Sequence, residues 1–424
     1  MRDQMDWKGK VRMSETIRLG DVCAKIGSGA TPRGGKDTYS SDGPYALIRS
    51  QNIYNDKFSH DGLAFISEQQ AAQLSNVKVQ ADDVLLNITG DSVARVCQVD
   101  KGILPARVNQ HVAIIRPDPD ILDAEFLRYF LVTPEMQAYM LAMASAGATR
   151  NALTKSMIEN FRVPTRSMLD QKAIASILGS LDDKIDLNRR MNETLEQTAR
   201  ALFKDWFVDF GPTKAKMAGQ AAYLETNLWA LFPERLDEAG MPEGWFTGKI
   251  ETILERLKVG KLYDQKSVLL YGEVPVFDQG KSGIIGYHNN APNIEASPQC
   301  RIAIFANHTC FQKIVDYDFS TIQNVIPYIG NNYPTEWVYY ATLGKQEFEE
   351  YKGHWPSLMV KETVRPSRQV AVAFKELVDP LLAKKSLNDQ ASTALAQTRD
   401  LLLPKLMSGE LRVRDAEAQV AEVL

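Results

Sequence analysis

The chain has 424 residues, of which 44% are hydrophobic and 24% charged, with a formal net charge of −4 at pH 7. This length exceeds one ordinary hydrophobic core, so we expect at least two domains. The slight negative charge argues against a protein that coats nucleic acid non-specifically, because such binding grows with the number of phosphates neutralised, although it permits local basic faces. No apolar stretch approaches the roughly 20 residues of a membrane helix, and the first residues lack the apolar core of a signal peptide, which predicts a cytoplasmic location.

Residues 14–167 are predicted to form a first globular domain in which short strands precede helices. Runs rich in β-branched residues and bounded by Gly, Asp or Pro favour strands at residues 45–48, 84–88, 94–99 and 111–115. Helical spacing of the apolar residues favours helices at residues 124–133 and 134–143.

Residues 168–210 and 368–410 are predicted to form two long spacer helices that repeat one pattern 200 positions apart. At this offset eight residues between 181 and 207 are identical in the second run: Leu181, Lys184, Leu187, Asn188, Leu195, Gln197, Thr198 and Leu202. As heptads, both runs give a coiled-coil seam, with Leu181, Leu195 and Asn188 in one and Leu381, Leu395 and Asn388 in the other. The alternative is two surface helices that pack on separate globular cores.

An Asn in the middle of a coiled-coil seam gives up stability in order to fix register. In an antiparallel pair, equivalent residues near the middle meet, so we expect Asn188 and Asn388 to lie against each other. Gly179 and Pro380 leave two alternatives open for each run: one continuous helix, or a short helix followed by a longer one that begins near these residues, since Asp379-Pro380 is suited to a helix start.

Residues 211–241 read as a connector, residues 242–367 as a second globular domain and residues 411–424 as a tail. The second domain resembles a shortened copy of the first. Glu336-Trp-Val-Tyr-Tyr340, for instance, lies 211 positions after Glu125-Phe-Leu-Arg-Tyr129. The order is therefore domain, helix, domain, helix.

No catalytic motif emerges from the sequence. Gly280-Lys281-Ser282 resembles the end of a phosphate-binding loop, but Pro275 stands where the earlier glycine is required. The five histidines are scattered singly, and the four cysteines form no Cys-x-x-Cys pair, so we expect no disulfide and no metal site.

Both globular domains contain polar, basic and aromatic residues of the kinds that contact base edges and phosphates. In the first domain the candidates are Ser28, Thr31, Arg33, Lys36, Arg49, Gln51, Asn52, Asn87, Thr89, Arg95, Arg107, Asn109 and Arg150. In the second they are Lys258, Lys261, Lys266, Lys281, Ser282, Tyr287, His288, Asn307, His354 and Trp355. Solvated loops have a similar composition, so each residue has a purely structural alternative.

Several motifs resemble those of the specificity (S) subunits of type I restriction-modification enzymes. They are Leu19-Gly-Asp-Val22 leading to Gly29-Ala-Thr-Pro32, the segment Asn109-Gln-His-Val-Ala-Ile-Ile-Arg-Pro117, the run from Val163-Pro164 to Leu195, and Pro242-Glu-Gly-Trp245. The resemblance covers nearly the whole chain. The second domain departs from it by lacking a Gly-x-Thr-Pro sequence and by having Gln323-Asn324-Val325 where the first domain has Asn109-Gln110-His111.

The resemblance implies an α+β fold of two target recognition domains, separated by two long antiparallel helices that form a coiled coil with an internal pseudo-twofold repeat. It implies that each domain recognises one half of a bipartite sequence in double-stranded DNA through the major groove, while the helices set the spacing and dock two DNA methyltransferase (M) subunits. Arg189, Arg190, Glu193 and Glu196 are the candidates on the outer helix faces.

The resemblance further implies a non-catalytic subunit that needs no cofactor of its own. S-adenosylmethionine would belong to the methyltransferase subunits, and ATP with Mg²⁺ to restriction and translocase (R) subunits. The alternative from a different class is a coiled-coil scaffold or regulator that binds proteins rather than DNA.

Overall fold

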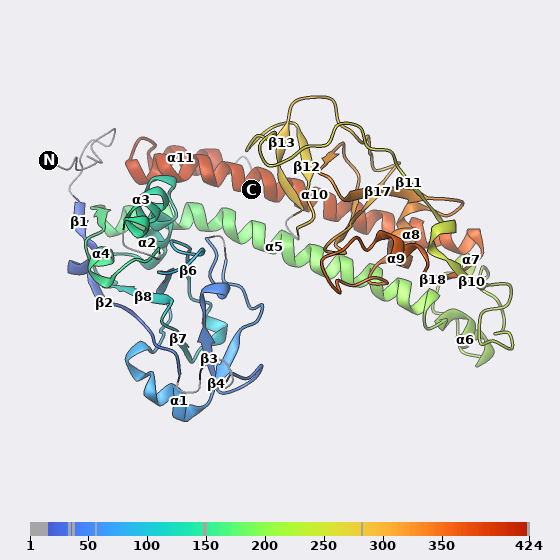
Figure 1. Cartoon of the computed structure of the whole chain (residues 1–424), viewed down its shortest axis with the longest axis horizontal. Helices are drawn as coiled ribbons and strands as arrows, with labels where there is room; N and C mark the ends of the chain where they lie inside the picture. Colours follow the sequence, from blue (N-terminus) through green and yellow to red (C-terminus); the bar gives the residue numbers. More distant parts are fainter. Residues whose placement is uncertain are drawn as a thin grey trace. The chain divides into compact units, whose positions relative to one another are not determined.

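The computed structural model describes residues 16–32, 35, 39–55, 57–146, 151–280 and 283–421 (Figure 1). The described chain divides into two compact units: unit 1 holds the residues up to 186 and from 392 onward, and unit 2 holds residues 187–391. Both units combine helices with β-sheets, which confirms the predicted α+β class.

Unit 1 is built around two sheets and a short strand pair. The larger sheet is antiparallel with the order β2-β8-β5-β6, the smaller has the order β4-β3-β7 with β3 and β7 parallel, and β1 pairs with β9. The strands are β1 (Thr16–Arg18), β2 (Cys23–Ser28), β3 (Tyr45–Ile48), β4 (Ala64–Ile66), β5 (Val84–Asn87), β6 (Val96–Gln98), β7 (Ala106–Val108), β8 (Val112–Pro117) and β9 (Arg162–Pro164). The helices are α1 (Glu68–Gln73), α2 (Ala124–Leu131), α3 (Pro134–Ser145), α4 (Lys155–Glu159) and α11 (Val413–Ala421), with parts of two long helices described below.

The predicted strands and helices of the first domain are confirmed, as β3, β5, β6, β8, α2 and α3. Burial on both faces explains why β5 lacks the usual alternation of apolar and polar residues. Val84 and Leu86 pack with the helices on one face of the sheet, whereas Leu85 packs with the smaller sheet on the other.

Unit 2 repeats this topology strand for strand. Its larger sheet has the order β11-β17-β14-β15, its smaller sheet the order β13-β12-β16 with β12 and β16 parallel, and β10 pairs with β18. The strands are β10 (Phe246–Lys249), β11 (Leu254–Arg256), β12 (Val274–Phe277), β13 (Ile284–His288), β14 (Ile302–Ala306), β15 (Gln312–Val315), β16 (Ser320–Thr321), β17 (Val325–Gly330) and β18 (Glu362–Arg365). The helices are α6 (Gly211–Met217), α7 (Thr226–Trp229), α8 (Thr335–Thr342) and α9 (Trp355–Met359).

Two long helices link the units in sequence: α5 (Met168–Phe207) and α10 (Arg368–Ser408). They run antiparallel within each unit. In unit 1 the Arg399 guanidinium donates to Asp182 over 2.7 Å, and in unit 2 the Asn192 amide donates to Asp389 over 2.7 Å, so numbers rise along one helix as they fall along the other. Leu181 and Leu395 are buried in the core of unit 1, Leu381 packs on the core of unit 2, and Leu195 is half-buried.

Of the two alternatives for each run, the structure shows the continuous helix, since Gly179 and Pro380 both lie inside unbroken helices. Gly179 serves packing: a Cβ there would lie 2.8 Å from the Glu125 carboxylate of α2. Around Pro380, the side chains of Val378 and Leu382 are buried in the core of unit 2 and hold the adjacent turns in place.

The predicted contact between Asn188 and Asn388 is also corrected. Both residues are buried, but the Asn388 amide donates to the Asn192 side-chain oxygen over 2.8 Å. Asn388 therefore faces position 192 of α5, four residues beyond its repeat-mate Asn188. Glu196 is likewise not on the outer face, because its carboxylate bonds to Lys385 across the helix pair and to Arg200 over 2.8 Å.

Candidate nucleic-acid interface

Unit 1 has a polar pocket of about 410 Å³ at one end of its larger sheet. Three loops form it: the one after β3, the one between β5 and β6, and the one before β8. The lining residues are Ser50, Gln51, Tyr54, Thr89, Gly90, Asp91, Ser92, Arg95 and His111. Gln51, Thr89 and Arg95 were predicted site residues, so the fold brings these three together.

A chain of hydrogen bonds orders one wall of this pocket. The Thr31 hydroxyl donates to the Gln110 side-chain oxygen over 2.5 Å, and the Gln110 amide lies 2.9 Å from Nε2 of His111. Nδ1 of His111 lies 2.6 Å from the Thr89 hydroxyl. Because the amide nitrogen can only donate, Nε2 accepts and Nδ1 carries the proton, which fixes the neutral ring in one tautomer.

Arg95 supplies the positive charge of the unit 1 pocket. Its guanidinium lies 4.7 Å from the centre of the Tyr54 ring, which orients the cation without neutralising it. The loop that carries Arg95 turns at Gly90 and Ala94, both of which have positive φ. A cation held in this way remains able to bind phosphate or a guanine edge.

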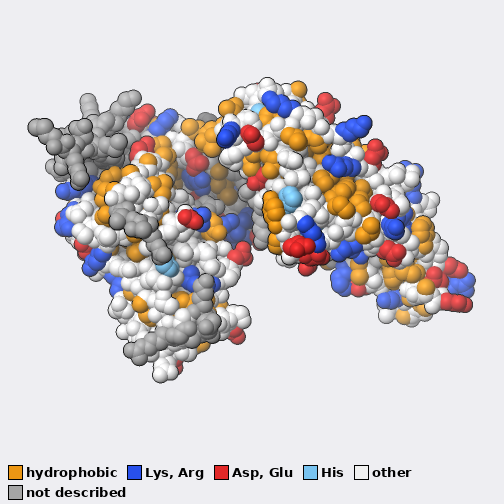
Figure 2. Space-filling model, in the orientation of Figure 1, with side chains coloured by type: hydrophobic (Ala, Val, Ile, Leu, Met, Phe, Trp, Pro, Cys, Tyr) orange, Lys and Arg blue, Asp and Glu red, His pale blue; other side chains and the backbone are white. Residues whose placement is uncertain are grey.

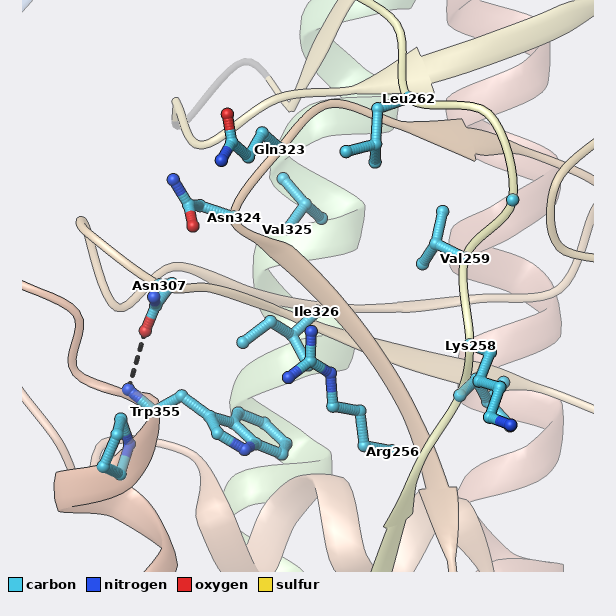
Figure 3. A pocket seen from close by; sticks show the side chains of 13 residues that line it. Arg256, Lys258, Val259, Leu262, Asn307, Gln323, Asn324, Val325, Ile326 and Trp355 are labelled. Atoms are coloured by element: carbon cyan, nitrogen blue, oxygen red, sulfur yellow. Dashed lines mark hydrogen bonds between the residues drawn. The ribbon is translucent and has the colours of Figure 1, made fainter.

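Unit 2 has a larger pocket, of about 840 Å³, with an apolar floor and a polar rim (Figure 3). It is lined by Arg256, Leu257, Lys258, Val259, Gly260, Leu262, Asn307, Gln323, Asn324, Val325, Ile326, Trp355 and Pro356. The predicted residues Lys258, Asn307 and Trp355 meet here. The Asn307 side-chain oxygen accepts from the Trp355 backbone N–H over 2.7 Å, which ties the loop after β14 to the start of α9.

The two pockets share part of their backbone frame in the repeated fold. In unit 1 the Ile88 N–H donates to the His111 carbonyl over 2.9 Å, and in unit 2 the Asn307 N–H donates to the Asn324 carbonyl over 2.8 Å. In unit 1 the bond joins the loop after β5 to the segment that leads into β8. In unit 2 it joins the loop after β14 to the segment that leads into β17, and β14 and β17 are the counterparts of β5 and β8. The same backbone frame thus holds a polar pocket in one unit and a partly apolar pocket in the other.

Six predicted site residues have buried side chains that bond within the fold: Asn52, Asn87, Arg107, Asn109, His288 and His354. The Asn87 amide donates to the Ser50 carbonyl over 2.8 Å, and the Arg107 Nε donates to the Ala71 carbonyl over 3.0 Å. The His288 ring stacks on Tyr263 at 4.2 Å, and burial lowers the pKa of its imidazole. These side chains shape the loops that carry the pockets.

The other predicted residues that the structure describes line neither pocket. Ser28, Thr31, Lys261 and Lys266 are exposed, and Arg49 and Tyr287 are half-buried. Arg33, Lys36, Arg150, Lys281 and Ser282 lie outside the described residues. On the face shown in Figure 2 the basic and acidic side chains are interspersed, as a small net charge predicts.

Arg256, Leu262, Gln323 and Asn324 were not among the predicted site residues of unit 2. The internal repeat contained a signal for two of them, since it set Gln323-Asn324-Val325 against Asn109-Gln110-His111. The backbone hydrogen bonds shift this alignment by one residue and make Asn324 the counterpart of His111. Within the described ranges, no group of three or more His, Cys, Asp and Glu residues is placed to hold a metal ion. No helix in the described part of the chain is both long and apolar enough to cross a membrane.

Comparison with known proteins gives one consistent result. Residues 12–197 match the family described as the type I restriction modification DNA specificity domain. The HindI specificity subunit of Haemophilus influenzae is 24% identical, over 86% of this chain and 94% of that protein. The MjaIX specificity subunit of Methanocaldococcus jannaschii is 25% identical, over 96% of each chain. The fold is similar to that of a type I restriction-modification S subunit from M. genitalium, with a TM-score of 0.52 and 16% identity over 96% of this chain and 99% of that one.

Proposed function

Because the chain is a type I restriction-modification specificity subunit, we propose that it recognises a bipartite sequence in double-stranded DNA, one half through the pocket of each unit. The observation that carries the proposal is the repetition of the site. Two copies of one topology place a pocket at the same sheet end, and each pocket presents amide and basic side chains. Such side chains distinguish bases in the major groove and bind the phosphates beside them.

We propose that this chain catalyses no reaction itself. Methylation and cleavage would be carried out by partner subunits, which would bind S-adenosylmethionine, ATP and Mg²⁺. The names of the relatives support this division of labour, since they are specificity subunits of restriction enzymes. The work would take place in the cytoplasm, where the DNA substrate is found.

We assign the paired helices two further roles. They would set the number of unread base pairs between the half-sites, and their outer faces would dock methyltransferase subunits. Arg189, Arg190 and Glu193 are exposed on α5 and are the candidates for docking. Ion pairs at such an exposed surface would contribute more to specificity and to association rate than to affinity.

Selection from a duplex library tests the proposal. The full chain, purified with its methyltransferase subunits, is expected to enrich two short sequences separated by a spacer of fixed length from random DNA. Replacing residues 14–167 by the corresponding domain of another specificity subunit should change one half of the enriched motif and leave the other half intact. A change in both halves, or the absence of any motif, contradicts independent recognition by the two units.

Single variants assign each pocket to its half-site. Gln51→Ala in unit 1 and Arg256→Ala in unit 2 should each relax selection in a different half, with an affinity loss of about ten-fold for the cognate duplex. Arg368→Ala, which removes an exposed cation of unit 2 outside the pocket and outside the predicted site residues, is the matched control for Arg256→Ala. If Arg368→Ala relaxes selection as much as Arg256→Ala does, the pocket is not the site of recognition.

A further inference from the structure

The unit 2 pocket has two chemically different sides (Figure 3). The carboxamides of Gln323 and Asn324 lie on one side, and the aliphatic side chains of Val259 and Leu262 lie on the other. The buried side chains of Val325 and Ile326 belong to the floor. A ligand that fits this site therefore presents hydrogen-bonding atoms to one side and an apolar group to the other.

The amide side is preorganised by the backbone. Asn324 has a φ of 66°, a left-handed conformation that Asn tolerates better than most residues. Its carbonyl accepts the Asn307 N–H, which fixes the direction in which the side chain leaves the loop. No hydrogen bond joins the carboxamide of Gln323 or Asn324 to a side chain in the described part of the chain, so these donors and acceptors remain available.

The apolar side is open to solvent. Leu262 is 49% exposed although it lines a pocket, and Val259 is half-buried beside it. Covering a water-exposed aliphatic side chain with another apolar group lowers the free energy of the system. By contrast, no Ala, Val, Leu or Ile is among the residues that line the unit 1 pocket, and its two ring side chains are Tyr54 and His111.

Two cations flank the unit 2 pocket and indicate an anionic ligand. Arg256 and Lys258 are exposed, and neither forms an ion pair with a described carboxylate. Their guanidinium and ammonium groups suit DNA phosphates. Charge therefore favours a nucleic acid over an apolar peptide as the ligand.

We infer that the unit 2 pocket recognises an adenine–thymine base pair, with the Asn324 carboxamide bonded to N6 and N7 of adenine and Leu262 packed on the thymine methyl group. In the major groove an A·T pair alone combines an adjacent donor and acceptor with a methyl group. A G·C pair offers two acceptors on guanine, which suit Arg or Lys better than an amide, and it has no methyl group. The inference rests on the proposed function and specifies what one half-site contains.

Base analogues test this inference without altering the protein. The complex of the full chain with its methyltransferase subunits is first used to select its motif, and Arg256→Ala identifies the half recognised by unit 2. In that half, replacing one thymine by uracil should weaken binding about four-fold, the affinity equivalent of one buried methyl group. Replacing the paired adenine by 7-deazaadenine, which lacks the N7 acceptor, should weaken binding about ten-fold.

Protein variants then locate the two contacts. With Leu262→Ala the thymine and uracil duplexes should bind equally, and with Asn324→Gly the adenine and 7-deazaadenine duplexes should bind equally. Glycine is the suitable replacement because it adopts positive φ without strain. Leu270→Ala, which removes a leucine that is 78% exposed but outside the pocket, is the control and should keep both discriminations.

Each outcome separates the inference from the proposed function. If a bipartite motif is selected but the unit 2 half contains no A·T pair, or both analogues bind as well as natural DNA, the inference is overturned and the proposed function stands. The inference is also overturned, and the proposed function still stands, if Leu262→Ala and Asn324→Gly continue to discriminate between natural DNA and the analogues. If no motif is selected, the proposed function fails and the inference fails with it. If Leu262→Ala instead weakens assembly with the methyltransferase, the pocket is a protein interface.

Discussion

A single carboxylate, Asp182, ties three elements of unit 1 together. It accepts hydrogen bonds from Arg128 over 3.0 Å and from Tyr129 over 2.7 Å, both on α2, and from Arg399 of α10 over 2.7 Å. Asp182→Asn should lower the free energy of unfolding of unit 1 by about 2 kcal/mol, because two largely buried cations lose their counter-charge. Hydrogen exchange of α2 peptides measures this loss, since five of the six tryptophans lie in unit 2 and tryptophan fluorescence would follow that unit. Asp183→Asn, an exposed neighbour, should have little effect.

The same residue makes the stability of unit 1 depend on pH. Burial alone would raise the pKa of Asp182, but Arg128 and Arg399 outweigh it and hold the pKa below its ordinary value of 3.8. A carboxyl group with a depressed pKa contributes stability above its ordinary pKa, and this contribution is lost as the pH falls through the lower folded value. Exchange protection of α2 should therefore fall below about pH 4 in the wild type and fall less steeply in Asp182→Asn. Equal slopes for the two proteins would contradict this origin of the acid sensitivity.

In unit 2 the buried Asn388 bonds to the half-buried Asn192, and this amide pair leads to a stability prediction of similar size. Asn388→Ala removes the donor to the Asn192 oxygen, which should cost about 1 kcal/mol of unfolding free energy. Gln390→Ala, at an exposed position of the same helix, is the control. Urea unfolding followed by tryptophan fluorescence measures both variants, and equal midpoints would show that the pair adds no stability.

At the scale of elements, a buried charge cluster attaches the sheet of unit 2 to its helices. The side chain of Arg301, just before β14, is 3% exposed and bonds to Glu336 of α8 over 3.1 Å and to Asp379 of α10. Arg301→Met should destabilise unit 2 by about 3–5 kcal/mol, because the Glu336 carboxylate would be left buried without its cation. Adding Glu336→Gln should recover part of the loss, whereas Lys375→Ala, which removes a half-exposed cation paired with Asp379, should cost less than about 1 kcal/mol. A double variant no more stable than Arg301→Met would contradict the uncompensated charge as the cause.

Elements were predictable from the sequence where a periodic pattern specified them. The strands at β3, β5, β6 and β8 and the repeated helices followed from apolar patterns and an identical register 200 residues apart. The helix continues through Gly179. Glycine is required there because a Cβ would lie 2.8 Å from the Glu125 carboxylate, a contact between positions 54 apart that no local rule contains. Asn87 and Asn52 have side chains suited to base recognition, but only the fold shows that they are buried beneath the loops that carry Gln51 and Arg95.

At the scale of the whole molecule, the residues that line the unit 2 pocket were harder to predict from the sequence than those that line the unit 1 pocket, because their positions follow from the tertiary fold. Gln323-Asn324 differs from Asn109-Gln110-His111 in sequence, and the equivalence emerged from backbone hydrogen bonds rather than from residue identity. The family resemblance supplied the function of the chain, whereas it said nothing about an apolar side of one pocket. That contrast between the units comes from Val259 and Leu262, which were unremarkable in the sequence.

The chain as a whole offers one test of the proposed spacing role of the paired helices. Both helices pass from one unit to the other, α5 between Asp186 and Leu187 and α10 between Ala391 and Ser392. Inserting one heptad at both points adds about 10 Å of helix at 1.5 Å per residue, while two turns of helix nearly preserve the seam. We expect the selected motif to keep both half-sites and to gain between about one and three unread base pairs, because base pairs are spaced about 3.4 Å apart. The control inserts a heptad in α5 alone, which puts the two helices out of register and should reduce assembly with the methyltransferase subunits. If the double insertion leaves the spacer of the selected motif unchanged, the helices do not set the distance between the half-sites.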